Sequence, residues 1–177
     1  MELQTVIERR QSIRRYKDQD IPEGDIRKII EAAGMAPSAK NLQNWHFVSI
    51  TNRHVIREIA DIVTAKNQQI SAEVEKIDDV KAAKFIKFCK NFTVFWKESA
   101  PVLTAVLTTD YIPDGYEQYE MIGADQEILD DLKLRRNPGM QSVGCALENF
   151  TLKAIELGYG TTILTSVNYA APEIEQY

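Results

Sequence analysis

The chain has 177 residues, with 44% hydrophobic and 27% charged residues and a formal net charge of −5 at pH 7. That length is enough for one domain with a sizeable core, and the composition is typical of a globular protein. The negative charge argues against a nucleic-acid-binding protein that works through bulk positive charge, and no apolar run is long enough to span a membrane. Because the chain is charged from Glu2 onward and has no apolar leader, we expect a cytoplasmic protein.

The N-terminal part is predicted to form two helices, a loop and a strand. Residues 3–10 place apolar side chains on one helical face, and residues 22–34 repeat them at the spacing of a buried helical stripe. A proline at the start and a glycine at the end of the second helix fit the usual helix boundaries. Residues 35–41 are rich in turn formers, and residues 45–50 have the apolar and aromatic content of a strand.

Helices dominate the middle of the chain as well. Helical patterns run from residue 53 to 65 and, rich in lysine, from 71 to 90. Residues 101–108 are predicted to form a fully buried strand because the run is continuously apolar. Residues 110–119 contain proline, glycine and three tyrosines, so we expect an exposed loop or lid there. Residues 125–134 are predicted to form a short helix.

The C-terminal part is predicted to contain a central core helix. Its wide apolar face covers residues 140–157, and Gly158 follows at the position where a helix commonly ends. Residues 159–165 are predicted to form a third strand, and a further helix begins at residues 171–173. Since helices outnumber strands and separate them, we expect a single α+β domain over residues 1–177.

A cluster near the N-terminus has the chemistry of a phosphate site. Arg10, Ser12 and Arg14 follow the first helix and precede a turn-rich run. Guanidinium groups bind phosphate oxygens in pairs, and a hydroxyl and backbone N–H groups add further donors. The alternative is a solvated surface patch, which the cluster by itself does not exclude.

The cysteines and histidines do not indicate a metal site. Cys89 and Cys145 lie far apart in apolar helical contexts, so we expect two buried free thiols rather than a disulfide. His46 and His54 have no cysteine, aspartate or second histidine at ligand spacing. We therefore expect no bound metal.

Several motifs taken together resemble the nitroreductase family of FMN-dependent oxidoreductases. They are Arg10-x-Ser12-Ile13-Arg14, a helix ending in Glu31-Ala32-Ala33, the run Ala36-Pro37-Ser38-x-x-Asn41-x-Gln43-x-Trp45-His46-Phe47, and the helix end Leu157-Gly158-Tyr159-Gly160-Thr161. The motifs follow the family's order and span most of the chain. The resemblance implies a nitroreductase-like α+β fold with a central sheet flanked by helices, in a homodimer with FMN at the subunit interface.

The resemblance also implies roles for the matched positions. These are, in chain order, Arg10, Ser12, Arg14, Pro37, Ser38, Ala39, Asn41, Thr165 and Ser166. The first three would hold the FMN phosphate and ribityl chain. The next four would come from the other subunit and line the flavin ring, and the last two would present backbone N–H groups to flavin N5 and O4. Trp45 and Phe47 are interpreted as packing residues.

The implied activity is hydride transfer from NAD(P)H through flavin N5 to a nitroaromatic, a quinone or another electron-poor small molecule. A single flavin face that donor and acceptor use in turn implies ping-pong kinetics. Because the proton can come from solvent or flavin, we expect no catalytic side chain, and the flavin carries the chemistry. Residues 111–119, with their tyrosines, are a candidate substrate lid.

The chain departs from the family pattern in two places. Asn44 stands where the family usually has proline, and family members usually continue beyond the position of Tyr177 with a strand and a tail. That tail often supplies a lysine or arginine to the FMN phosphate. If the chain lacks this C-terminal strand and tail, we expect Arg10 and Arg14 to carry more of the phosphate binding than usual.

Three alternatives stay open from the sequence. The first is a protein that binds FMN for storage or sensing without turnover. The second is a flavoenzyme with a different reaction, as in the dehalogenating and flavin-fragmenting relatives. The third is a helical interaction module without a cofactor.

Overall fold

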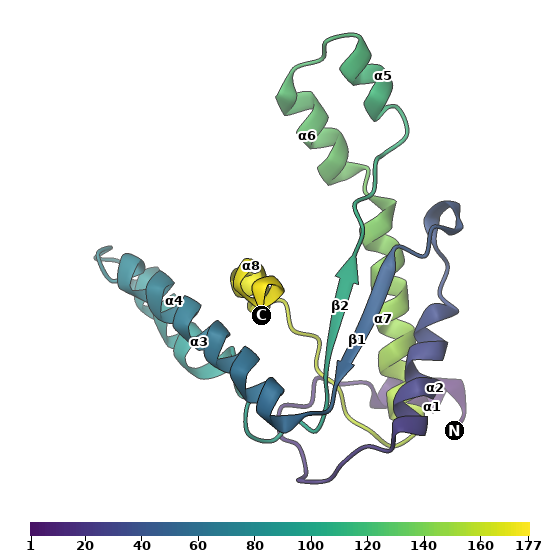
Figure 1. Ribbon diagram of the computed structural model, residues 1–177, viewed down its shortest axis with the longest axis vertical. Coiled ribbons are helices and arrows are strands. Elements are labelled where there is room, and N and C mark those ends of the chain that lie inside the picture. The colour runs from purple at the N-terminus through teal and green to yellow at the C-terminus, as the bar shows by residue number, and fades with distance from the viewer. The chain divides into compact units, whose positions relative to one another are not determined.

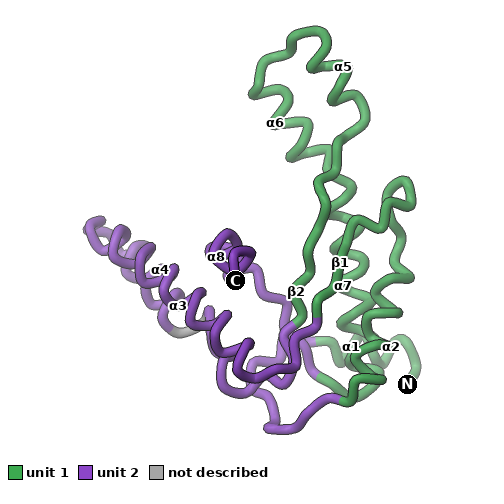
Figure 2. The backbone as a smooth tube through the Cα atoms, in the orientation of Figure 1, with its two compact units in different colours: residues 1–10, 22–48, 104–159 green, residues 11–21, 49–103, 160–177 purple. Residues whose placement is uncertain are grey.

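The chain forms two compact units, each assembled from several separate segments (Figures 1 and 2). The computed structural model describes residues 1–90 and 93–177. Unit 1 contains residues 1–10, 22–48 and 104–159, and unit 2 contains residues 11–21, 49–103 and 160–177. No helix in these two described ranges combines the length and the apolar composition needed to cross a bilayer.

The order of the helices and strands follows most of the sequence predictions. The elements of unit 1 are α1 (Leu3–Arg9), α2 (Glu23–Gly34), η1 (Ala39–Asn41), most of β1 (Trp45–Ile50) and β2 (Leu103–Thr108), α5 (Tyr116–Met121), α6 (Gln126–Arg135) and α7 (Pro138–Glu156). Those of unit 2 are α3 (Arg53–Val74), α4 (Val80–Phe92), η2 (Ser166–Ala170) and α8 (Ala171–Gln176).

The core of unit 1 lies between α2 and α7. From α2, Ile26, Ile29 and Ala33 are buried, as the stripe in the sequence predicts. Val143 and Ala146 are buried on the facing side of α7. Each fully buried large aliphatic side chain contributes roughly 1.5–3 kcal/mol, so the packing of these two helices stabilises unit 1.

The sheet consists of β1 and β2, which run antiparallel in Figure 1. The Thr109 N–H donates to the Asn44 carbonyl at 3.0 Å, which continues the pairing beyond the strands. The strand β2 is only half-buried and its last two residues are exposed, so the prediction of a fully buried strand is wrong. Burial on both faces needs a covering layer on each side of a sheet, which an apolar run alone does not provide.

The predicted third strand, residues 159–165, is extended chain that pairs at a single position. Thr161 forms one parallel bridge with Ser12. The Thr162 hydroxyl donates to the Ile13 carbonyl. In a longer strand a backbone N–H would donate to that carbonyl instead. One bridge closed by a side chain is not a strand, so this prediction is wrong.

The break between the two helices predicted in unit 2 lies later in the chain than expected, between the end of α3 at Val74 and the start of α4 at Val80. The sequence suggests a break between residues 65 and 71, yet α3 runs without interruption through this polar stretch. Its Asn67 is only 4% exposed and donates from Nδ2 to the Thr93 Oγ1 at 2.7 Å. A buried amide with a specific partner lets a polar stretch stay helical inside the protein.

Ile56, Ile59 and Ala60 on α3 form the core of unit 2 together with Trp96 and Ala100. The indole N–H of Trp96, which is 1% exposed, donates to the Thr93 carbonyl at 2.8 Å. The polar end of this large side chain is therefore satisfied inside the core.

Two further expectations need correction. Residues 116–119 belong to α5, which begins after Gly115 at a φ of 90°, so only the first part of the predicted loop is a loop.

Cys89 is buried as expected, and burial raises the pKa of its thiol. Cys145 is exposed, because it lies with Gln141 and Gly144 on a face of α7 that the core of unit 1 does not cover.

Candidate functional site

The predicted phosphate segment in unit 2 lies beside residues 160–162. The Ile13 N–H donates to the Thr161 carbonyl at 2.9 Å, within the bridge between Ser12 and Thr161. The Thr162 hydroxyl donates to the carbonyl of Ile13. Two stretches that are almost the whole chain apart in sequence are thus held together by one backbone hydrogen bond and one side-chain hydroxyl.

Gly160 permits this close approach. A Cβ added at Gly160 would lie 2.6 Å from Cγ1 and 2.9 Å from Cβ of Ile13. Neither atom is the far end of a flexible side chain, so a larger residue at this position would separate the two segments. The glycine of the matched motif at the end of α7 therefore has a direct physical role here.

The side chains of this segment are available to a ligand. Ser12 and Arg14 are exposed, and Arg14 forms no ion pair with any carboxylate in the described residues. Burial raises the pKa of the nearby Tyr16, while a hydrogen bond with Thr162 and the positive charge of Arg14 act in the opposite direction. A guanidinium without a carboxylate partner is free to bind an anion.

Thr165 and Ser166 follow a few residues later in the same unit. Thr165 is exposed and is the N-terminal cap of η2, and its carbonyl accepts from the Asn168 N–H at 3.1 Å. Ser166 is half-buried at the first position of η2. The first N–H groups of such a turn have no partner within it, which suits a backbone donor role.

The remaining predicted residues belong to unit 1. Arg10 is exposed at the C-terminal end of α1, and its own N–H closes that helix by donating to the Val6 and Ile7 carbonyls. Pro37 and Asn41 are exposed, whereas Ser38 and Ala39 are half-buried.

The loop around η1 has an unusual backbone. Lys40, Asn41 and Gln43 have φ values of 54°, 52° and 46°, and they are the only non-glycine residues with positive φ in the described part of the chain. Such conformations cost of order 1–3 kcal/mol each and persist only where the surroundings hold them. Such conformations are concentrated in binding sites, so their presence in this loop supports its assignment as a ligand-binding segment.

Side-chain hydroxyls hold this loop at both ends. The Ser38 Oγ accepts from the Gln43 N–H at 2.7 Å, which closes the loop on itself. The Ser142 Oγ on α7 accepts from the Ala39 N–H at 3.0 Å and donates to the Pro138 carbonyl at 2.7 Å. Pre-formed loops of this kind bind ligands at a lower cost in conformational entropy.

Asn44, which replaces the family's usual proline, is buried directly after this loop. Its carbonyl accepts from Thr109 at the end of the β1–β2 pairing. Phe47 stacks on Phe150 of α7, with ring centroids 6.0 Å apart, in agreement with its interpretation as a packing residue. The substitution is therefore accommodated inside unit 1 rather than at the exposed loop.

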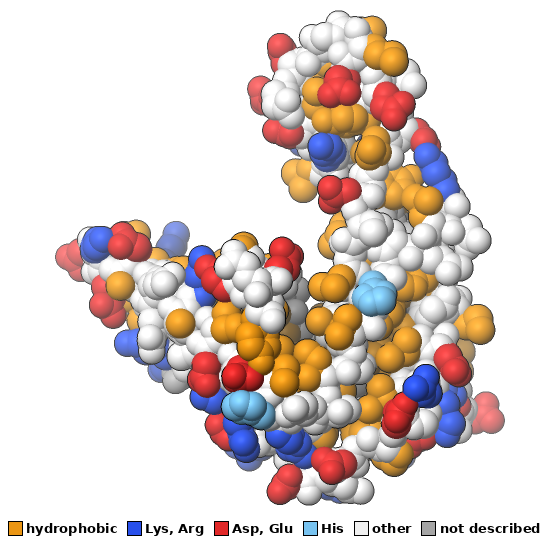
Figure 3. Space-filling view, in the orientation of Figure 1, with side chains coloured by type: hydrophobic (Ala, Val, Ile, Leu, Met, Phe, Trp, Pro, Cys, Tyr) orange, Lys and Arg blue, Asp and Glu red, His pale blue; other side chains and the backbone are white. Residues whose placement is uncertain are grey.

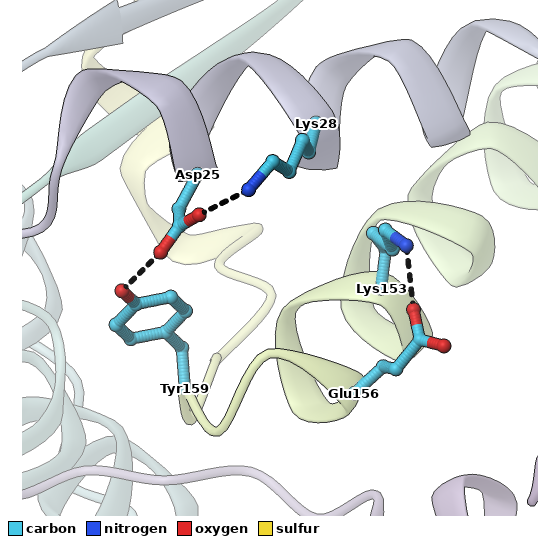
Figure 4. A network of polar contacts seen from close by, with 5 residues as sticks. All are labelled: Asp25, Lys28, Lys153, Glu156 and Tyr159. Atoms are coloured by element: carbon cyan, nitrogen blue, oxygen red, sulfur yellow. Dashed lines mark hydrogen bonds and ion pairs between the residues drawn. The ribbon is translucent and has the colours of Figure 1, made fainter. Parts of the chain in front are cut away.

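A polar network ties the C-terminal end of α7 to the start of α2 (Figure 4). The Tyr159 hydroxyl donates to the Asp25 Oδ2 at 2.8 Å, and the Lys28 Nζ contacts the Asp25 Oδ1 at 2.9 Å. These hydrogen bonds, the one from Lys28 first, lower the pKa of Asp25. The same hydrogen bond raises the pKa of Tyr159. Because Tyr159 directly precedes Gly160, its bond to Asp25 also fixes the chain at that point.

Sequence reasoning missed several residues that shape the site. Lys40 lies inside the matched motif but its pairing with Asp114 has no sequence signal, and Ser142 and Thr162 act through contacts with distant segments. Over residues 1–90 and 93–177, no three His, Cys, Asp or Glu side chains are grouped as a metal site would need.

Comparisons with known proteins cover nearly the whole chain. The model of the nitroreductase family matches residues 7–177. A BluB-like flavoprotein from Clostridium difficile 630, solved by crystallography, is 55% identical with a TM-score of 0.91, over 99% of this chain and 80% of that one. A nitroreductase with bound FMN from Bacteroides fragilis NCTC 9343 is 23% identical with a TM-score of 0.65, over 100% of this chain and 78% of that one. The latter likeness concerns the fold, and it confirms the α+β class.

Curated relatives match shorter segments. The NADH dehydrogenase of Thermus thermophilus is 43% identical over 63 residues, which are 34% of this chain and 31% of the relative. The 4-nitrobenzoate reductase of a Nocardioides species is 34% identical over 73 residues, which are 41% of this chain and 29% of the relative. The chain thus spans less than half the length of these relatives.

Proposed function

The chain belongs to the nitroreductase family, and from this premise we propose that it is an FMN-dependent oxidoreductase. It would take hydride from NAD(P)H and deliver it to a nitroaromatic, a quinone or a similar electron-poor small molecule. The observation that carries the proposal is the 55% identity with a flavoprotein over 99% of the chain. The matches to an NADH dehydrogenase and a 4-nitrobenzoate reductase support the choice of donor and acceptor.

The residues present fit an FMN phosphate. Arg14 is exposed and has no carboxylate partner in the described residues, and Ser12 is exposed beside it on an extended segment. A guanidinium and a hydroxyl are donors that suit the oxygens and the negative charge of a phosphate. Arg10 supplies a second exposed guanidinium at the end of α1.

The loop at residues 37–41 fits a flat ring. Pro37, Ser38 and Ala39 are small, and Asn41 is exposed on a backbone that is already fixed at positive φ. Thr165 and Ser166 supply backbone N–H groups at the start of η2. In a homodimer, which we propose as the working assembly, the loop would serve the site of the partner copy.

When bound, FMN supplies reversible two-electron hydride chemistry at N5. The protein's own contribution is to bind and orient. Arg10, Ser12 and Arg14 hold the phosphate, while the amides of Thr165 and Ser166 stabilise negative charge on the ring. We assign no side chain as a proton donor. A shared binding face for donor and acceptor gives ping-pong kinetics.

Three measurements on the purified protein test this function. The extracted chromophore should co-elute with FMN, NADH or NADPH should bleach it without oxygen, and a nitroaromatic or quinone should restore the colour. Bound FMN that NAD(P)H does not reduce would instead support a storage or sensing role. A colourless protein that takes up no FMN would contradict both readings.

The assembly has a separate test. Light scattering should give twice the chain mass of 20.1 kDa. A monomer with full activity would contradict the proposal that the loop at residues 37–41 serves a partner copy.

A further inference from the structure

Two segments of unit 1 meet the N-terminal part of α7. The loop at residues 38–43 reaches it through the hydrogen bond from the Ala39 N–H to the Ser142 Oγ. The segment at residues 109–114 reaches it through Tyr111, because a Cβ added at Gly139 would lie 2.8 Å from the Tyr111 Cβ. The backbone of Gly139 therefore forms the surface against which Tyr111 lies.

Lys40 links the loop directly to residues 109–114. Its ammonium forms an ion pair with the Asp114 carboxylate and lies 5.8 Å from the centroid of the Tyr111 ring. The hydrogen bond that the Lys40 ammonium donates to Asp114 is the largest cause that raises the pKa of Lys40. One side chain of the loop thus holds two residues of the neighbouring segment.

The link starts from a strained part of the backbone. Lys40 has a φ of 54°, and Asn41 follows at 52°. A lysine has no local side-chain hydrogen bond that favours this region, unlike asparagine. Contacts beyond the loop must therefore contribute to holding it. They are the bond of Ala39 with Ser142 and the contacts of Lys40 with Asp114 and Tyr111.

Residues 109–114 carry the helical hairpin formed by α5 and α6. These two helices pack on each other, and Lys133 of α6 lies over the Tyr116 ring at 4.7 Å. Met121, Ile122 and Leu134 are 83%, 78% and 81% exposed, and orange side chains are visible on the hairpin in Figure 3. The hairpin is connected to the rest of unit 1 at residues 109–114, which Lys40 contacts through Asp114 and Tyr111, and at the start of α7, where Gly139 lies against Tyr111.

We propose that Lys40 is a positioning residue that couples the flavin loop to the α5–α6 hairpin through Asp114 and Tyr111. The inference rests on the proposed function, in which the loop at residues 37–41 lines the flavin. A ligand that fixes the loop favours the conformation in which Lys40 meets Asp114, so it also fixes the base of the hairpin. By linkage, a substrate that orders the hairpin strengthens flavin binding by the same factor by which bound flavin strengthens the binding of that substrate.

The strength of the link suits a reversible motion. The side chains of Lys40 and Asp114 are 50% and 70% exposed. Exposed ion pairs change equilibria by between about 1.5-fold and fivefold. A contact of that size shifts the populations of the hairpin conformations without restricting the hairpin to one of them. Salt screens the ion pair and so weakens the coupling.

Hydrogen–deuterium exchange on the full chain tests the coupling. Asp114→Asn removes the charge at nearly constant shape, whereas Asp114→Glu keeps it. In protein stripped of flavin, Asp114→Asn should raise exchange at residues 38–43 as well as 110–116 by up to about fivefold, and Asp114→Glu should restore it. Substitutions of Lys40 are less suitable, because a new residue at positive φ changes the strain of the loop itself.

Added FMN provides the second readout. In the unchanged chain FMN should slow exchange in the hairpin at residues 115–136, and in Asp114→Asn this effect should shrink although FMN still binds. The acceptor KM should rise with little change in kcat. Glu23→Gln, which breaks the exposed pair with Arg27 on α2, is the matched control and should change neither quantity.

The outcomes separate the two proposals. Unchanged exchange at residues 38–43 in Asp114→Asn overturns the coupling, even if FMN binds and turnover proceeds. Failure of the chain to bind FMN at all overturns the proposed function, while the exchange of the flavin-free protein still reports on the link between Lys40 and Asp114.

Discussion

Arg14 is the residue on which the phosphate assignment depends most directly. It lies on an extended segment fixed by the bridge of Ser12 with Thr161, and no carboxylate of the described residues neutralises it. Its neighbour Arg15 is also exposed and carries the same charge. Adjacent side chains of an extended segment point to opposite sides. Replacing either arginine therefore removes the same charge, but from opposite sides of the segment.

We predict that Arg14→Ala weakens FMN binding by roughly tenfold to a hundredfold. Hydrogen bonds to charged groups contribute about 1.5–3 kcal/mol, and 1.4 kcal/mol is one decade in affinity. Arg15→Ala is the control and should change the affinity by much less. Fluorescence titration of stripped protein measures both, and equal losses in the two variants would mean that only overall charge attracts the flavin.

Gly160 gives the second prediction at this scale. Gly160→Ala places a Cβ 2.6 Å from the Ile13 Cγ1, so the two segments must move apart. Overpacking of this kind costs typically 1–3 kcal/mol, which urea denaturation can measure. Gly24→Ala, where nothing lies within 4 Å of the added Cβ, should be neutral or slightly stabilising. Equal stability of Gly160→Ala and the unchanged chain would show that the segments are not in close contact.

At the scale of elements, α2 and α7 are joined by more than their apolar faces. Tyr159 and Lys28 both contact Asp25, and Asn149 on α7 donates to the Ala32 carbonyl at 3.2 Å. The first contact fixes the exit of α7, which leads directly to Gly160. This polar contact at the end of unit 1 has no signal in the helical periodicity of the sequence.

We predict a pH dependence from this network. The folded pKa of Asp25 is lowered by Lys28 and by Tyr159, so its stabilisation is present above the unfolded value of about 3.9 and is lost as the pH falls through the folded pKa. Asp25→Asn should therefore flatten the acid side of the stability curve. The pKa of Tyr159 is raised, so its contribution is lost as the pH rises through that higher value, and Tyr159→Phe should flatten the alkaline side.

Urea midpoints measured across these two pH ranges test the prediction. Glu31→Gln removes a negative charge from the same helix and serves as the control. Parallel curves for Asp25→Asn and the unchanged chain below pH 4 would contradict the assignment.

At the scale of the whole molecule, FMN should act as a stabilising ligand. A ligand that binds only the folded chain at a hundred times its dissociation constant adds about 2.7 kcal/mol. For a chain of this size, each kcal/mol raises Tm by roughly 2–4 °C. We therefore predict an increase of about 5–11 °C in thermal unfolding experiments.

Riboflavin, which has the same ring but no phosphate, is the control for this prediction. At equal concentration it should raise Tm by much less, because Arg10, Ser12 and Arg14 then have no anion to bind. An equal increase with both ligands would assign the binding energy to the ring and remove the role proposed for the arginines.

Much of the fold followed from local patterns. The helices α2 and α7 and the strand β1 have periodicities that one element can satisfy alone, so their positions were predicted closely. The predicted break in α3 was wrong because the partner of Asn67 lies 26 residues away. The third strand was wrong because a strand is defined by its neighbours, and Thr162 ends the pairing after one bridge.

By itself, the sequence determined the family, the helical order and the residue types of the candidate flavin site, because motifs and periodicity are local properties. Only the tertiary structure placed the segment of Ser12 beside Thr161, gave Gly160 its steric role, and joined Lys40 to Asp114. These facts depend on contacts between residues far apart in the chain, and loop backbones such as that of Lys40 are held by such contacts rather than by their own preferences.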